Sequence, residues 1–246
     1  MFSGSVTFNL FRRLVPPAVL LATVAALRPV EVRLAAAQPV SASRQMVALA
    51  GGGGTLAVLG GFRAMAAGGF WLRANLAWER HDAAATLALV HLTVAADERP
   101  LYFWLNGARM IAYDLAEWRL PADAPRAVRQ RVAIEQAGAA LDFLRRGVES
   151  RGADPELLIE MANIRLRVLG DRAGAARLFR QAAEMPGAPW YAARLHAELL
   201  RELGSPAEAL AWLRQVLPGL PSDDPGARRD VVLARIKELE SLAAGQ

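Results

Sequence analysis

The side chains that most often carry out catalysis or bind metals are few in this chain and poorly placed to act together. There are three histidines, His81, His91 and His196, and no cysteine. No histidine has a second one four residues away, the spacing that places two ligands on one helical face. Without cysteine there is no thiolate ligand, no cysteine nucleophile and no disulfide. We therefore expect each histidine to be structural and no metal to be bound.

Serines and carboxylates also fall outside the common catalytic patterns. The chain contains neither the G-x-S-x-G sequence of hydrolases nor the P-loop sequence of nucleotide triphosphatases. Carboxylate pairs such as Glu198 and Glu202 lie four residues apart beside arginines. That spacing is typical of solvated ion pairs along a helix. These observations predict a protein that is not an enzyme and that needs no cofactor.

A glycine-rich stretch resembles a nucleotide-binding motif. Residues 52–57, GGGTLA, match the pattern G-x-G-x-x-A of dinucleotide-binding folds. The pattern needs a strand before it, a helix after it and an acidic residue about 20 positions later. Here a helical pattern follows, and the first acidic residue downstream, Glu79, lies inside that pattern. The sequence therefore disfavours a nucleotide site.

Two other interpretations remain for the surrounding uncharged segment, residues 46–62. Small residues four apart, such as Ala50 and Gly54, could form a closely packed helix face in a membrane. The interpretation that we prefer is a glycine-rich connector over residues 46–61. It would lead into a first helix that begins near Phe62.

The composition favours a folded, all-α protein. Hydrophobic residues make up 54% of the chain and charged residues 22%, which is enough apolar material for a core. Alanine and leucine, both good helix formers, dominate long stretches, and β-branched residues are sparse. The 246 residues suffice for one sizeable domain with a tail, or for two small domains.

The net charge of +5 does not indicate a protein that binds nucleic acid. Five of the 29 basic residues, but only one of the 24 acidic residues, lie within residues 1–45. The rest of the chain therefore holds 24 basic and 23 acidic side chains and is nearly neutral. Because a nucleic-acid binder carries positive charge on its folded surface, we expect no nucleic-acid partner.

Residues 1–45 have the organisation of a targeting segment. Arg12 and Arg13 precede the uncharged run Leu14–Leu27, an order shared by signal peptides and membrane anchors. The run is shorter than the roughly 20 residues that cross a bilayer as a helix. The alanines at 35–37 could form a cleavage site. Three interpretations stay open: an uncleaved membrane anchor, which we prefer, a cleaved signal, and a plain buried helix.

A period of 34 residues is the strongest regularity of the chain. Gly170-Asp171 recurs as Gly204-Ser205. At the same offset, small or large residues recur in four further pairs: Ala175 with Ala209, Leu178 with Trp212, Phe179 with Leu213, and Ala182 with Val216. This spacing predicts the second helix of a helical hairpin, in which small residues let that helix pack closely on the first.

Capping residues place the ends of these helices. Asp171 is a predicted N-cap for a helix that begins at Arg172, and Ser205 before Pro206 predicts another. The first helix of each pair is predicted at Glu156–Leu169 and Trp190–Leu203, each closed by a glycine.

On these positions the chain resembles the tetratricopeptide repeat (TPR) family, whose unit is a 34-residue helix–turn–helix. The resemblance covers about residues 62–246 and is clearest in the two C-terminal repeats. It implies a right-handed solenoid of antiparallel helix pairs. In the two preceding repeats some consensus residues are replaced, with His81 in place of glycine and Thr86 in place of alanine.

The remaining elements follow from the same register. The predicted elements are a helix over Phe62–Arg80, its partner over residues 83–97, a helix from Leu101 with Gly107 at a small-residue position, an insertion over Leu120–Pro125, a long helix from Arg126 to about Ser150, and a capping helix over Ala227–Leu242. The predicted organisation is therefore an export or anchor segment at 1–45, a connector at 46–61 and a helical domain at 62–246.

Three phrases also look similar to uncharacterised, membrane-anchored bacterial proteins of this repeat type. They are LGGFR…WLRA at 59–74, LRRGVE at 144–149 and PGAPWYAARLHAELLRELG at 186–204. This resemblance implies an anchor and a scaffold role and no activity.

The resemblance also implies which residues bind a partner, because certain positions of the first helix in each TPR unit face the concave groove. The residues carried over are Trp71, Asn75, Trp78, Trp104, Arg167, Tyr191, Arg194, Glu198 and Arg201. Because guanidinium groups pair with carboxylates, the arginines predict an acidic segment of a protein or peptide partner. For the tryptophans, packing in the core is an equal alternative. The lysine-based carboxylate clamp of chaperone-binding TPR proteins is absent, and only Asn75 matches it.

We therefore expect a non-catalytic protein–protein interaction scaffold of the bacterial cell envelope, anchored in the inner membrane, with its helical domain in the periplasm. The alternative is a structural subunit of a membrane complex, with two N-terminal membrane segments and a cytoplasmic helical domain.

Overall fold

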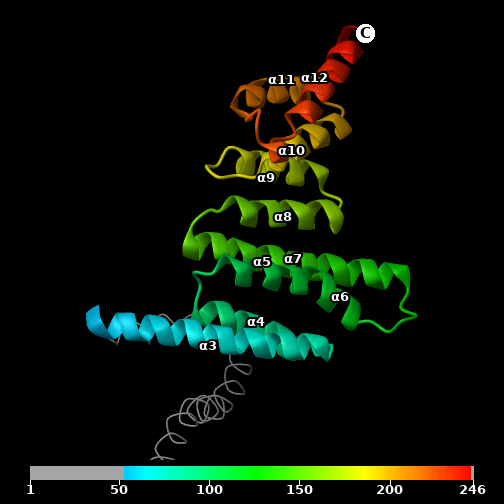
Figure 1. Ribbon diagram of the computed structural model, residues 1–246. Coiled ribbons are helices and arrows are strands. Elements are labelled where there is room, and N and C mark those ends of the chain that lie inside the picture. The colour runs from blue at the N-terminus through cyan, green and yellow to red at the C-terminus, as the bar shows by residue number, and fades with distance from the viewer. Residues whose placement is uncertain (1–52, 245–246) are drawn as a thin grey trace, which may run out of the picture. The chain divides into compact units, whose positions relative to one another are not determined.

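The computed structural model describes residues 53–244, with side chains from residue 61 onward. The described residues form helices and no strand, which confirms the all-α class (Figure 1). The predicted anchor at 1–45 lies outside them. The chain divides into two compact units, and each is described by itself. The first contains the residues up to Glu79 and Ala84–Asp97, and the second contains Arg80–Ala83 and the residues from Glu98 onward.

The first unit is a pair of helices, α3 (Gly53–Glu79) and α4 (Ala83–Ala96), which lie side by side (Figure 1). The helix α3 begins at Gly53, well before the start near Phe62 that the sequence predicted. Residues 53–61 of the predicted connector are therefore helical. Glycine lowers helix propensity but does not prevent a helix from extending once its nucleus has formed. No described helix is long and apolar enough to cross a membrane.

One face of α3 forms the core of this unit. Ala67, Trp71 and Ala74 are buried there, at a spacing of four and three residues. The guanidinium of Arg63 donates from Nε to the carbonyl oxygen of Ala96 at 2.9 Å. A cation at this place satisfies a free carbonyl at the C-terminal end of α4 and complements the helix dipole.

The second unit is a succession of helices in which each packs on the one before it (Figure 1). Its elements are α5 (Leu101–Arg109), the π-helix η1 (Met110–Asp114), α6 (Leu115–Trp118), α7 (Arg126–Arg151), α8 (Pro155–Arg167), α9 (Arg172–Ala183), α10 (Trp190–Glu202), α11 (Pro206–Val216), the 3-10 turns η2 (Leu217–Gly219) and η3 (Pro225–Ala227), and α12 (Arg229–Ala244). From α7 onward the predicted boundaries agree with these bounds to within two residues.

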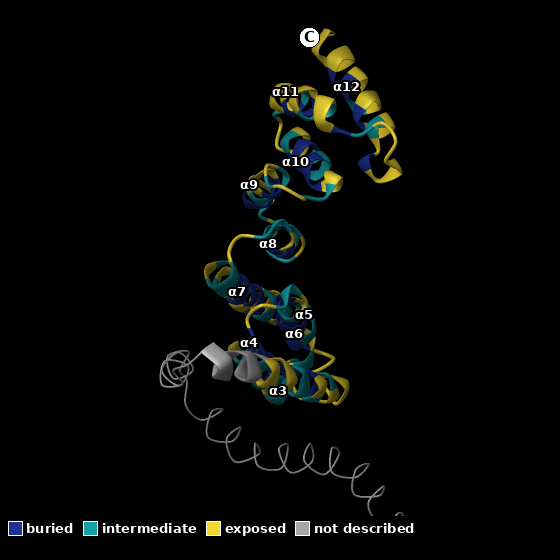
Figure 2. Cartoon of the chain, turned by 60° about the vertical axis from the view of Figure 1, so that its left-hand side comes forward, coloured by how far each residue is buried: buried dark blue, intermediate teal, exposed yellow. Residues whose placement is uncertain are grey.

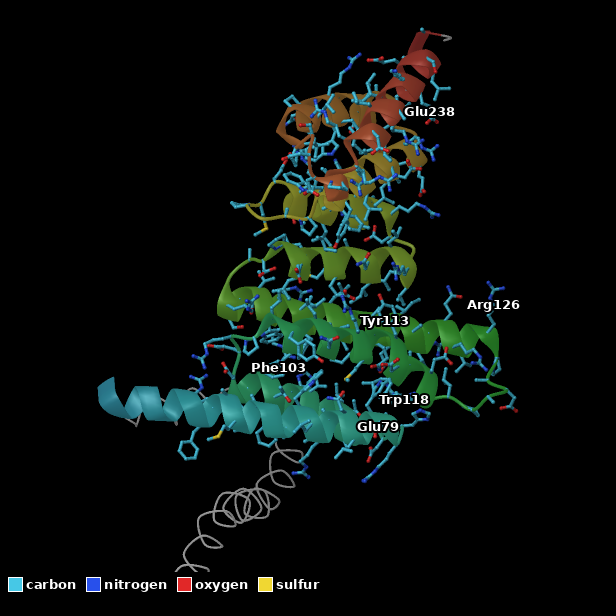
Figure 3. All side chains as sticks on the ribbon, viewed as in Figure 1. Glu79, Phe103, Tyr113, Trp118, Arg126 and Glu238 are labelled. Carbon is cyan, nitrogen blue, oxygen red and sulfur yellow. The ribbon has the colours of Figure 1, made fainter. Side chains whose placement is uncertain are left out.

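Left-handed backbone positions close the predicted turns. Gly170 has φ of 64° and Gly204 has φ of 81°, a conformation that glycine adopts without strain. The non-glycine residue His81 has φ of 57° at the position where the repeat register expects glycine. Its ring stacks on Trp118, with 4.9 Å between the ring centroids (Trp118 is labelled in Figure 3). This contact offsets part of the backbone strain that a non-glycine residue carries there.

The two predicted caps differ. The carboxylate of Asp171 accepts a hydrogen bond from the backbone N–H of Gly174 at 2.7 Å, which confirms it as the N-cap of α9. Ser205 occupies the N-cap position of α11, but its side chain makes no capping hydrogen bond. The start of α11 therefore depends on Pro206 at the first helical position and on tertiary packing.

The 34-residue period is visible in the core. Ala175 and Ala209 are both fully buried, and Phe179 and Leu213 fill the interior beside them. His196 is buried as well, and its Nδ1 lies 2.8 Å from the carbonyl oxygen of Ala176. The small alanines allow neighbouring helices to approach, and the large side chains fill the space between them.

Candidate partner-binding face

The nine predicted groove residues fall into four structural settings. Trp71 is buried in the first unit, and the side-chain amide of Asn75 donates to the carbonyl oxygen of Trp71 at 2.8 Å. Trp78, near the end of α3, is partly exposed. In this unit only Trp78 of the three offers much surface to a partner.

Trp104 belongs to the core of the second unit. It is buried, its indole N–H donates to the carbonyl oxygen of Glu98 at 2.8 Å, and its ring lies 4.8 Å from that of Phe143. The ring also packs on Gly147, where an added Cβ would come within 2.9 Å of Cδ2. The residue is therefore a packing residue, the alternative that the sequence had left open for the tryptophans.

The polar residues predicted on α10 contact the C-terminal elements. Arg194 donates to the carbonyl oxygen of Ala227 at 2.8 Å, and burial lowers its pKa. Glu198 pairs with Arg201 on its own helix and with Arg235 of α12 at 3.1 Å. The bond from Arg201 is the main cause of the lowered pKa of Glu198. Arg194 and Glu198 therefore contact the turn before α12 and α12 itself, whereas Arg201 pairs with Glu198 on its own helix.

Arg167 and Tyr191 lie in a fourth setting, near an ion pair whose carboxylate is buried. Arg109, at the end of α5, donates to Oε2 of Glu160 on α8 from both Nε (3.0 Å) and Nη2 (2.8 Å). The side chain of Glu160 is only 5% exposed, so removal of Arg109 would leave a carboxylate uncompensated inside the protein. This hydrogen bond is also the main cause of the raised pKa of Arg109.

The charges of this ion pair act on two tyrosines. Tyr113, on η1, is half-buried, and burial, together with the Glu160 carboxylate, raises its pKa. Burial and the carboxylates of Glu156 and Glu160 raise the pKa of Tyr191 on α10. Arg167 acts on Tyr113 in the opposite direction. Charge interactions therefore reach between side chains of η1, α8 and α10.

We call this set the arginine–tyrosine face: Arg109, Tyr113, Glu156, Glu160, Arg167 and Tyr191. The label of Tyr113 locates it in Figure 3. Both phenols remain protonated at neutral pH, because their pKa values lie above 10. Each hydroxyl can therefore donate a hydrogen bond to an anionic or carbonyl oxygen.

Arg167 is the free cation of this face. It is exposed, and no described carboxylate lies within ion-pair distance of it. Its neighbour Arg165, by contrast, pairs with Asp171 at 2.7 Å. A guanidinium without a carboxylate partner, together with the hydroxyl of Tyr113, can bind a carboxylate through several hydrogen bonds.

Sequence reasoning identified Arg167 and Tyr191 but missed Arg109 and Tyr113. The signal that could have revealed them is their spacing of four residues, which places both on one side of a helix. They were missed because the TPR positions carried over to this helix do not include them, and Tyr113 also lies in the π-helix of residues 110–114. A π-helical turn changes the direction of the side chains that follow it and is frequent at functional sites.

The described residues contain no group of three or more acidic or histidine side chains that could hold a metal ion. Comparison with known proteins adds no relative: no protein family, no curated protein and no solved structure matches this chain.

Proposed function

We propose that this protein is a TPR-type helical scaffold of the bacterial cell envelope, and that its arginine–tyrosine face binds an extended segment of a partner protein. The observation that carries the proposal is Arg167, an exposed guanidinium without a described carboxylate partner, whose charge acts on the protonated Tyr113. We propose further that the bound segment is acidic, because that arrangement is complementary to a carboxylate.

The TPR interpretation is supported by the two pairs α8–α9 and α10–α11. Their helices have 13, 12, 13 and 11 residues. Equivalent alanines are buried 34 residues apart, and glycines in the left-handed conformation close α8 and α10. A solenoid of this kind presents equivalent faces of successive helices side by side, which suits an extended ligand.

Binding is tested with Arg167→Ala and a matched control. Arg177 on α9 is also an exposed arginine without a described carboxylate in ion-pair distance, so Arg177→Ala removes the same charge from outside the face. The partner is first captured by chemical crosslinking in membranes, and its affinity for the purified variants is then titrated. Loss of a charge-assisted hydrogen bond predicts about 10- to 100-fold weaker binding for Arg167→Ala.

Unchanged binding by Arg177→Ala together with weaker binding by Tyr191→Phe would assign the contact to this face. If Arg167→Ala and Arg177→Ala weaken binding equally, the effect is one of net charge and the proposal fails.

The location in the cell is a separate part of the proposal. We propose that residues 1–45 anchor the chain in the inner membrane and that the helical domain faces the periplasm. We expect activity from a reporter that works only in the periplasm when it is fused after Gln246. Activity of a cytoplasmic reporter there instead would support the alternative with two membrane segments.

A further inference from the structure

The helix α3 carries a second apolar face that nothing in the described structure covers. Four large side chains on it are exposed: Phe62 (57%), Met65 (60%), Leu72 (68%) and Leu76 (50%). Together with Gly69 they follow a spacing of three and four residues. We call these five residues the α3 stripe. Figure 2 shows exposed residues recurring along α3.

The stripe lies on the opposite side of α3 from the face that forms the core of this unit. The core face contains Ala67, Trp71 and Ala74, and the helical repeat places these about half a turn away from Leu72 and Leu76. A surface helix normally buries one stripe and exposes polar residues on the other side. An exposed strict three–four repeat is instead the pattern of a seam between two helices.

Glycines within α3 support a helix as the occupant. Added Cβ atoms at Gly61, Gly68 and Gly69 would meet no other atom within 4 Å. Glycine destabilises a helix relative to alanine, and here no described contact requires its small size. Close approach of a second helix backbone would use that space.

The order of residues in the stripe favours a second copy of the same chain. Gly69 lies at its centre, with Met65 and Leu72 on either side and Phe62 and Leu76 beyond them. Two antiparallel α3 helices that cross at Gly69 would place Met65 of each copy against Leu72 of the other. A two-fold interface is self-complementary in this way.

Charge favours the same orientation. Arg73 lies within the length of the stripe, between Leu72 and Leu76. A parallel pair would bring Arg73 beside Arg73 of the other copy, and like charges side by side are unfavourable. An antiparallel pair separates the two Arg73 side chains along the helix axis.

We propose that α3 is a dimerisation element, pairing antiparallel about Gly69 with α3 of a second copy of this chain. The proposal does not depend on the arginine–tyrosine face. Four side chains of this size and exposure offer on the order of 400 Å² per copy, about half of the roughly 800 Å² in a standard interface. The dimer is therefore weak in solution and depends on concentration. Attachment of both copies to one membrane would raise their effective concentration.

The test uses disulfide crosslinking of the full chain, which has no native cysteine. Met65→Cys and Leu72→Cys chains are purified in detergent, mixed and oxidised. The expected result is a covalent dimer in the mixture at several times the yield of either chain alone. Ile134→Cys, an apolar position of α7 that is 48% exposed, is the control for random collision and should not crosslink.

A charge test follows the same pairing. Met65→Lys and Leu72→Asp should each weaken self-association at least 10-fold in sedimentation velocity, because a charge would then face an apolar residue. A mixture of the two variants should form heterodimers that are stronger than either homodimer. Circular dichroism of each variant should match that of the parent, since both side chains are largely exposed.

Several results would overturn the proposal. One is a crosslinking yield of the Met65→Cys and Leu72→Cys mixture that is no higher than the yield of Ile134→Cys. Another is a Leu72→Cys chain that crosslinks preferentially with itself. The last is self-association that neither charged variant changes. The last result would also arise if a lipid surface or another segment of the chain covered the stripe.

Discussion

Two regions of the larger unit reach helical structure in different ways. In α8–α11 the helices are of similar length, and the chain carries local signals at their ends: Asp171 as a cap, and Gly170 and Gly204 in the left-handed conformation. In the region α5–α7, a broken helix with a π-helical turn packs against one helix of 26 residues. The N-cap positions of α5 and α7 are prolines, which have no capping side-chain group, as is also the case before α10.

Long-range contacts replace local signals in the second region. Trp104 lies on Phe143 and Gly147 of α7, and Arg109 binds Glu160 of α8. A repeat can therefore be recognised from the sequence where short-range signals determine the ends of each helix. Where contacts between distant residues decide, the repeat register is lost, and here that region holds two of the six residues of the arginine–tyrosine face, Arg109 and Tyr113.

We expect the largest loss of stability from substitutions in the core of each region. Phe143 and Phe179 are both fully buried, so Phe143→Ala and Phe179→Ala should each lower the free energy of unfolding by about 3–5 kcal/mol. Chemical denaturation followed by circular dichroism measures this. Leu203→Ala at an exposed position is the control, with an expected change within about 0.5 kcal/mol. A small effect of Phe143→Ala alone would show that α5–α7 is loosely packed.

The next largest loss of stability is expected at the contact between Trp104 and Gly147 of α7. An added Cβ at Gly147 would lie 2.9 Å from Trp104, whose ring is held by Phe143 and by its own hydrogen bond. Gly147→Ala should therefore cost about 1–3 kcal/mol by overpacking. Gly138→Ala on the same helix meets open space and should stabilise the protein by up to about 1 kcal/mol. Equal shifts in melting temperature for the two variants would contradict the packing of Trp104 against α7.

A smaller effect compares the two caps of the regular region. Asp171→Ala removes a side-chain bond to the start of α9 and should cost about 1 kcal/mol. Ser205→Ala should change stability by no more than a few tenths of a kcal/mol, because its hydroxyl makes no capping bond. Thermal melts of both variants decide this. If Ser205→Ala is as costly as Asp171→Ala, the serine caps α11 after all.

The smallest effect concerns pH. Burial is the main cause of the lowered pKa of His196, which falls below 6.5 in the folded protein. The unfolded chain then binds more protons as the pH falls below about 6.5, so stability should decrease from that point through the folded pKa. His196→Phe removes this titration and should make the decrease between pH 7 and pH 5 shallower than in the parent. A parallel pH profile for the two proteins would mean that the imidazole is open to solvent.

Much of the regular region could be predicted from single residues. The cap at Asp171, the left-handed glycines and the buried alanines at 175 and 209 depend on local geometry and on a repeated spacing. The candidate site was predicted only in part. Tyr113 lies in a π-helix, for which the chain carries no clear local signal. Arg194 was assigned to the groove by its place in the TPR repeat, and its contact with Ala227, 33 residues away, is not visible in that spacing.

The sequence by itself determined the helical class and the ends of α8 to α11, since helix propensity, capping and turn conformation act within a few residues. Only the tertiary structure decided which polar side chains remain free for a partner. Arg167, Arg194 and Arg201 have the same chemistry. Arg194 contacts Ala227 before α12, and Arg201 pairs with Glu198. Arg167 has no described carboxylate partner, since nearby Glu160 is bound by Arg109. Burial and ion pairing depend on distances across the fold, which residue spacing along the chain does not specify.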